Sequence, residues 1–197
     1  MKFLRKTKDF KVLLESLIYR EGRTNVNRQI KQLLITEQKN FCAYTEKYIS
    51  ELDSSEVEHF NSSLKYSEDY YNYYAVIRRA NQYKKDNEYL EASFYKTLFF
   101  QNPEVFNNRV RYLKDGVYEE VIEADSEAKE LIAFLGFNHP NLYEQRKRHI
   151  KRLKRNFDNA GYTNEKCMQY FRDHKEDLNF VTAIEVELDL DLSEFYV

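Results

Sequence analysis

Glycine and proline are scarce in this chain, and their scarcity most narrows the folds it can adopt. Only four Gly and two Pro occur among 197 residues, whereas β-rich folds need many turn residues between short strands. Long stretches instead place apolar residues three and four positions apart, which is the spacing of a helix with one buried face. We therefore predict a mainly α fold with a small β component (α+β), formed as a single domain over residues 1–197.

The composition is that of a folded, soluble protein. Hydrophobic residues make up 42% and charged residues 32%, and 17 Tyr and 14 Phe provide material for a core. The net charge of −2 gives the whole molecule no electrostatic bias toward nucleic acid, so any such bias must be local. The two cysteines do not make a disulfide framework, and no stretch approaches the roughly 18 apolar residues of a membrane span. We expect a cytoplasmic protein without a membrane partner.

Five segments have the pattern of amphipathic helices. Two of them form a helical N-terminal part, residues 1–40, in which the second helix begins near Thr24 or Asn25 with a side-chain cap. The other three lie in the second half, where Pro140 stands near the first turn of one helix and Thr163 or Asn164 precedes another. For four of the five helices the sequence pattern predicts both ends: 8–20, 125–136, 140–157 and 164–175.

Four segments are expected to be β-structure. Two short strands, 41–44 and 57–60, precede a helix expected from Asp69 onward, and together they make a core unit over residues 41–90. The rest, residues 91–197, begins with a hairpin over 109–121 around Asp115-Gly116, a favoured tight-turn dipeptide. It ends with a strictly alternating acidic strand over 184–192, interpreted either as a charged edge strand or as a docking strand for a partner.

A group of side chains in the 41–90 unit suits phosphodiester hydrolysis. This reaction needs a base for water and a cation for the phosphate, and histidine is neutral enough at cellular pH to be the base. His59 is that candidate, while Glu58 and Asn81 offer the oxygen ligands that Mg²⁺ prefers. Asn72 is placed to bind backbone and fix the loop that carries His59. Taken alone, an adjacent Glu and His is most often a surface pair, and an Asn among tyrosines is a polar turn.

The order of these residues resembles the HNH nuclease family, which has a ββα-metal fold. More narrowly, it is similar to the HNH subunits of the Septu PtuB type and of some retron systems, which accompany an ATPase in prokaryotic anti-phage defence. The matching segments lie within roughly residues 35–155, and each is weak alone while the ordered set is more specific. They are Cys42-Ala43-Tyr44-Thr45-Glu46, Glu58-His59-Phe60, Asn72 and Ala80-Asn81-Gln82-Tyr83-Lys84.

The resemblance implies a role for each matching residue. His59 matches the general base, Asn72 the asparagine that steadies the catalytic loop, and Glu58 and Asn81 the metal ligands. Lys84 lies one helical turn after Asn81, within reach of a phosphate. The implied cofactor is Mg²⁺ or Mn²⁺, and the implied partners are DNA and an AAA or ABC-type ATPase, in a homo- or hetero-oligomer.

The chain departs from this family at a second metal site. Related proteins hold a structural Zn²⁺ with two Cys-x-x-Cys pairs, and the four matching positions here are Cys42, Thr45, Ile77 and Ala80. One thiol cannot form that site, so we predict no structural zinc. Ile77 and Ala80 are expected to join an apolar core instead.

Basic residues suggest where a nucleic acid would lie. Residues 146–155 hold seven Lys or Arg in ten positions. Such a run is usually a solvated helix face, and its functional alternative is a surface that follows a phosphate backbone. The candidate nucleic-acid contacts are Arg78, Arg79, Lys84, Lys85, Arg146, Lys147, Arg148, Lys151 and Arg152.

The sequence thus leads to one main hypothesis and two alternatives. The main hypothesis is a metal-dependent HNH DNA endonuclease, the effector of an ATPase-associated anti-phage complex. The first alternative is a catalytically silent HNH-like scaffold that binds DNA or the ATPase. The second is a basic-helix nucleic-acid binder whose motif match is accidental.

Overall fold

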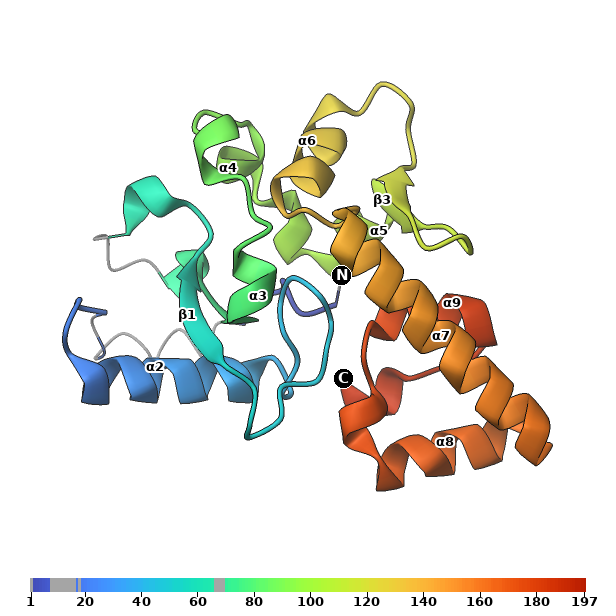
Figure 1. The fold of residues 1–197 in the computed structure, drawn as a ribbon. Coiled ribbons are helices and arrows are strands. Elements are labelled where there is room, and N and C mark those ends of the chain that lie inside the picture. The colour runs from blue at the N-terminus through green and yellow to red at the C-terminus, as the bar shows by residue number, and fades with distance from the viewer. Residues whose placement is uncertain (1, 8–16, 18, 66–69) are drawn as a thin grey trace.

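The computed structural model describes residues 2–7, 17, 19–65 and 70–197, and within them the predicted fold class is confirmed. Helices dominate, and the strands form two separate two-stranded antiparallel sheets. Figure 1 shows α2 and β1 on one side of the molecule and α7, α8 and α9 on the other. The expected helix over 8–20 lies outside the described residues, apart from Leu17, Tyr19 and Arg20, which are not helical.

Helix α2 (Thr24–Glu37) confirms the second N-terminal helix but not its expected cap. Arg23 occupies the cap position and makes no side-chain hydrogen bond there. Ile30, Leu34 and Ile35 form the buried side of the helix. This side packs against the first β-hairpin, so α2 forms one wall of the expected 41–90 unit.

The first hairpin pairs β1 (Ser55–His59) with β2 (Tyr73–Ile77), and here two predictions were wrong. Residues 41–44 form no strand, since Phe41 makes only an isolated bridge to Tyr48. Residues 73–77, expected to be helical, are a strand because this aromatic and β-branched run is buried on both faces. The short helix α3 (Arg78–Asn81) follows directly. The order ββα is therefore present, but β1, β2 and α3 form it.

The second hairpin was predicted correctly. Strand β3 (Val110–Tyr112) pairs with β4 (Tyr118–Glu120), with Tyr112 opposite Tyr118. Gly116 lies in the turn with a φ of +98°, a backbone conformation that residues other than glycine rarely adopt. Two short helices, α4 (Phe94–Thr97) and α5 (Pro103–Asn107), lead into this hairpin.

Three predicted helices of the second half are confirmed, with ends set by local caps. Helix α6 (Ser126–Phe134) is capped by Asp125, whose side chain accepts from the Ala128 N–H. Helix α7 (Pro140–Ala160) begins with proline at its first position, and α8 (Asn164–Asp173) is capped by the Thr163 hydroxyl. Single 3₁₀ turns complete the described elements: Ser62–Leu64, Tyr70–Asn72, Asp86–Glu88, Phe99–Gln101, Lys175–Asp177 and Ser193–Phe195.

The acidic C-terminal strand is the third wrong prediction. Residues 181–188 form helix α9 (Val181–Leu188), and Leu190 and Leu192 continue into the core beyond it. Its acids do not form an open face: Glu185 pairs with Lys2 at 2.8 Å, and Glu187 accepts from the Tyr112 hydroxyl at 3.1 Å. Neither the edge-strand nor the docking-strand interpretation of 184–192 fits this arrangement.

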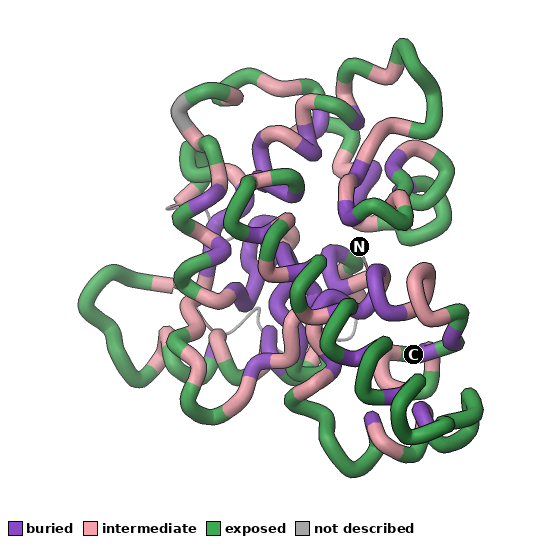
Figure 2. The backbone as a smooth tube through the Cα atoms, turned by 45° about the vertical axis from the view of Figure 1, so that its right-hand side comes forward, coloured by how far each residue is buried: buried purple, intermediate pink, exposed green. Residues whose placement is uncertain are grey.

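Buried side chains from Phe3 to Leu192 form one contiguous core. Figure 2 shows buried positions through the interior and exposed positions along the outer turns. Phe60, directly after the candidate base, stacks on Phe100 with ring centres 4.3 Å apart and meets Phe134 edge to face. Among the described helices, none combines the length and the apolarity needed to cross a membrane.

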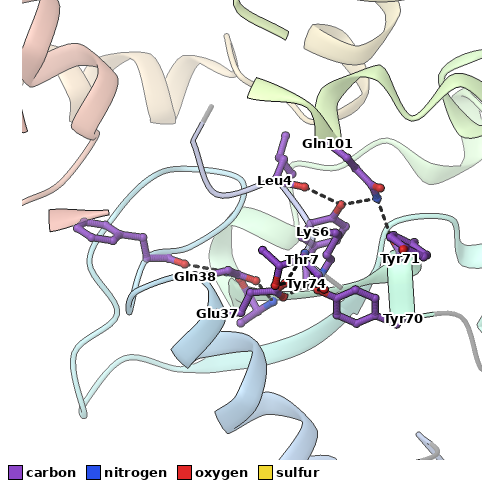
Figure 3. Close-up of polar contacts among 11 residues, drawn as sticks. Leu4, Lys6, Thr7, Glu37, Gln38, Tyr70, Tyr71, Tyr74 and Gln101 are labelled. Atoms are coloured by element: carbon purple, nitrogen blue, oxygen red, sulfur yellow. Dashed lines mark hydrogen bonds and ion pairs between the residues drawn. The ribbon is translucent and has the colours of Figure 1, made fainter. Parts of the chain in front are cut away.

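The N-terminal segment enters this core through a polar network, drawn in Figure 3. The Lys6 ammonium pairs with Glu37 at 3.2 Å, and both side chains are almost wholly buried. Glu37 also accepts from the Tyr70 hydroxyl, which in turn accepts from the Thr7 N–H at 3.0 Å. Residues 6 and 7 are thereby tied to the end of α2 and to the 3₁₀ turn that precedes β2.

Candidate active site

His59 is the last residue of β1, and it lies in an aromatic pocket. Its ring meets those of Tyr19 and Tyr73 edge to face, with centres 4.8 and 5.0 Å apart. The Nε2 atom is buried without a hydrogen-bond partner, an uncommon state for a polar atom in a folded protein. Burial, with smaller contributions from Lys65 and Lys84, lowers the pKa of His59 to about 4. The imidazole is therefore neutral at cellular pH.

Asn72 holds the turn that follows His59. Its side-chain oxygen accepts from the Asn61 N–H at 2.6 Å, and its side-chain nitrogen donates to the Asn61 carbonyl at 3.0 Å. The Asn72 carbonyl also accepts from the Phe60 N–H at 2.8 Å. The predicted backbone contact of Asn72 is thus present, and it fastens both residues that follow the candidate base.

Glu58 points to the opposite side of β1 from His59, because neighbouring strand residues face opposite sides. Its carboxylate meets the ammonium of Lys84, which also donates to the His59 carbonyl at 2.7 Å and pairs with Asp86 at 2.8 Å. The Lys84 side chain has no exposed area. Burial raises the pKa of Glu58, and the charge of Lys84 offsets part of that rise. The expected phosphate contact is therefore wrong for Lys84, since its ammonium is buried and already paired with two carboxylates.

Asn81 lies on α3, beside the same face of β1. Its side-chain nitrogen donates to Glu56 at 3.0 Å. The motif order does not single out Glu56 or Asp86, although Glu56 stands two positions before Glu58 and so shares its side of the strand. Asp53, a nearby acid along the chain, accepts from the Ser50 N–H and hydroxyl within its own turn.

Carboxylate and amide oxygens near α3 are the kind of ligand that a hard cation prefers. In this structure, however, the carboxylates of Glu58 and Asp86 bind the Lys84 ammonium. Glu58 already balances an ammonium, and a divalent ion beside it would repel that ammonium at close range. Within the described ranges, no three His, Cys, Asp or Glu side chains converge as metal ligands. In this arrangement the carboxylates bind the ammonium of Lys84 and do not fit a resident Mg²⁺ or Mn²⁺. The metal requirement remains a prediction from the resemblance.

The four positions that match the zinc site of the related proteins now have structural surroundings. Ile77 and Ala80 join the main core, as predicted. The Cys42 thiol is buried and accepts from the Ile77 N–H at 3.3 Å, so two of the four positions are in contact. One thiol, one hydroxyl and two alkyl groups lack the donors of a zinc site, so the absence of structural zinc remains a prediction from donor chemistry.

Arg146 was also misassigned as a nucleic-acid contact. It is 4% exposed, and its guanidinium donates to the Gly116 carbonyl at 3.1 Å and to the Phe137 carbonyl at 2.9 Å. It falls on the buried stripe of α7 with Leu142 and Ile150. The remaining basic candidates are exposed and form two groups, one on and after α3 and one on α7: Arg78, Arg79 and Lys85, and Lys147, Arg148, Lys151 and Arg152.

Comparison with protein-family models, with curated proteins and with solved structures found no match to this chain.

Proposed function

We propose that this chain is an HNH-type endonuclease that cleaves DNA as the effector of an ATPase-associated anti-phage complex in the cytoplasm. The observation that carries the proposal is the pair of hydrogen bonds between the Asn72 side chain and the Asn61 backbone. These bonds fix the turn directly after His59. The order β1, β2, α3, with Asn81 on the helix, supports the same assignment. The proposal rests on this agreement between the motif order and the local geometry.

In this proposal His59 takes the proton from the attacking water at its Nε2 atom, which is buried in the present arrangement and becomes accessible to water for that step. Its neutral state at cellular pH supports that role. Asn72 acts as a positioning residue, because it holds the backbone after His59 and not the reacting atoms. Arg78, Arg79 and Lys85 are exposed near α3 and supply positive charge for the DNA backbone.

A plasmid-nicking assay with Mg²⁺ or Mn²⁺ tests this function. It includes ATP and the ATPase encoded by an adjacent gene, which is itself an expectation of the proposal. We expect nicking by the wild type, loss of at least about a hundredfold in His59→Ala and in Asn81→Ala, and loss on chelation. His174→Ala is the matched control, since His174 is an exposed histidine just after the last residue of α8. Equal activity in all four proteins would refute the catalytic assignment.

The second candidate function is a catalytically silent HNH-like scaffold that binds DNA or the ATPase. The ion pair between Lys84 and Glu58 favours it, because it occupies the carboxylate that the related proteins use for metal. This candidate predicts DNA binding that is equal in wild type and His59→Ala, together with no nicking by either protein under any metal tested.

A further inference from the structure

A pocket of about 420 Å³ lies between α7 and a separate stretch of chain. Side chains three and four positions apart on α7 share one side of the helix and form one wall. The other wall is an antiparallel bridge between two residues far apart in the sequence. The residues concerned are Gln145, Arg148, His149 and Arg152 on α7, and Lys47 and Asn179 on the bridge.

The pocket carries an excess of positive charge. Within the part of the chain that the structure describes, Lys47 and Arg148 have no carboxylate partner, and Arg148 donates only to the Glu144 carbonyl at 3.2 Å. Arg152 pairs with Asp177 at 2.5 Å. Three cationic side chains thus line the pocket, and one carboxylate, that of Asp177, pairs with one of them. The two cations without a carboxylate partner, Lys47 and Arg148, lie on opposite walls.

His149 helps to fix the orientation of Arg152. Its Nε2 lies 3.0 Å from the Asp177 carbonyl, which can only accept, so Nε2 carries the proton. Its Nδ1 then accepts from the Arg152 guanidinium at 3.3 Å. Burial, reinforced by the charge of Arg152, lowers the pKa of His149 to about 4 and keeps this tautomer neutral. The arrangement holds a guanidinium in place at the edge of the pocket.

We propose that this pocket binds a phosphate group. Lys47 and Arg148 provide the charge from opposite walls, Arg152 provides an oriented guanidinium, and Gln145 provides a neutral donor. A nucleic-acid backbone and a free nucleotide offer the same phosphate chemistry. This inference rests on the proposed function in one respect: the proposed function is the reason that we expect the bound phosphate to belong to DNA.

Binding of a labelled DNA duplex, followed by fluorescence anisotropy between about 50 and 200 mM salt, tests the site. The pocket variant is Lys47→Gln/Arg148→Gln. The matched control, Lys154→Gln/Arg155→Gln, removes the same two charges from exposed positions outside the pocket. We expect the pocket variant to weaken binding at least about tenfold and to lower the salt slope by about 2, and the control to change affinity less than about threefold.

A second arm titrates ATP and inorganic phosphate into the same proteins by calorimetry. Loss of nucleotide binding in the pocket variant alone, with DNA binding unchanged, supports the site and assigns a free nucleotide as its ligand. Equal losses in pocket and control variants, or no loss with any of the three probes, would overturn the proposal. His59→Ala separates the two proposals, because it should abolish nicking without changing binding in the pocket.

Discussion

Lys84 lies beneath the surface between two carboxylates, although its sequence position after Asn81 had suggested contact with a phosphate. A buried ion pair contributes little net stability compared with an apolar replacement, but removal of one partner leaves an uncompensated charge. Removal of Lys84 would leave the Glu58 and Asp86 carboxylates without the cation that they pair with.

We therefore expect Lys84→Met to lower the free energy of unfolding by about 3 to 5 kcal/mol, measured by urea denaturation. Glu58→Gln added to this variant should restore part of the loss, because it removes one of the two stranded charges. Lys85→Met, at an exposed neighbour, should change the free energy by less than about 0.5 kcal/mol. If Lys84→Met matched Lys85→Met, the buried ion pair would have no structural role.

The pKa of His59 gives a second prediction at the scale of one residue. The folded value of about 4 lies below the ordinary 6.5, so the unfolded chain binds more protons in that interval. The contribution of His59 to stability is present above pH 6.5 and is lost as the pH falls toward 4. Solvent screening keeps its size below about 3 kcal/mol, the value that about 1.4 kcal/mol for each pH unit would give.

Urea denaturation of wild type and His59→Gln across this pH range measures the effect. We expect the free energy of unfolding of the variant to fall less steeply with acidification than that of the wild type. His149 has a similarly low pKa and is retained in both proteins, so the difference isolates His59. Parallel curves would show that the His59 imidazole is not desolvated.

Among individual residues, sequence order singled out His59, Asn72 and Asn81 as candidates but did not predict their surroundings. The contact of Asn72 with backbone follows from local chain geometry, and the sequence could anticipate it. The burial of Arg146 and Lys84 could not be anticipated from charge alone. Their partners include the carbonyls of Gly116 and Phe137 and the carboxylate of Asp86, which only tertiary packing brings near.

At the scale of elements, helices with distinct caps were predictable, while short apolar segments were not. Helices α6, α7 and α8 have caps or prolines that mark their starts, and the β3–β4 turn has Asp-Gly. Strand β2 and helix α9 have neither signal at their starts. Alternation over 184–192 indicated a strand, but tertiary contacts decided for a helix over most of that segment.

One of those contacts comes from Glu46, which is fully buried. Its carboxylate accepts from the Thr182 N–H in the first turn of α9 and from the Lys2 N–H, both at 2.8 Å. Burial alone would raise the pKa of Glu46, but the charge of Lys2 and the hydrogen bond from Thr182 help to bring it below the ordinary value. The side chain therefore acts as a cap supplied from another part of the chain.

We expect Glu46→Ala to destabilise the protein by about 2 to 4 kcal/mol, because two partly buried N–H groups lose their acceptor. Hydrogen exchange followed by mass spectrometry should show faster exchange in α9 than elsewhere in the molecule. Glu187→Ala, which removes only the contact with the Tyr112 hydroxyl, is the control and should leave α9 protected. Unchanged protection of α9 in Glu46→Ala would contradict the capping role.

At the scale of the whole molecule, the predicted class and the order of most elements agree with the structure, but the way distant segments meet was not predictable. The α+β character follows from residue spacing along the chain. The single core depends on contacts such as Phe60 with Phe100 and Phe134, which no periodicity encodes. The same holds for the pocket between Lys47 and α7.

The contact between Glu46 and Thr182 also bears on how the protein matures during synthesis. The two residues are 136 positions apart along the sequence. The Glu46 carboxylate has no N–H donor from α9 until residues 181–188 have left the ribosome. Pairing of such distant residues is slow compared with local helix formation. On a nascent chain, α9 would therefore gain its cap only after residue 188 has emerged, long after the turn that carries Glu46 has been made.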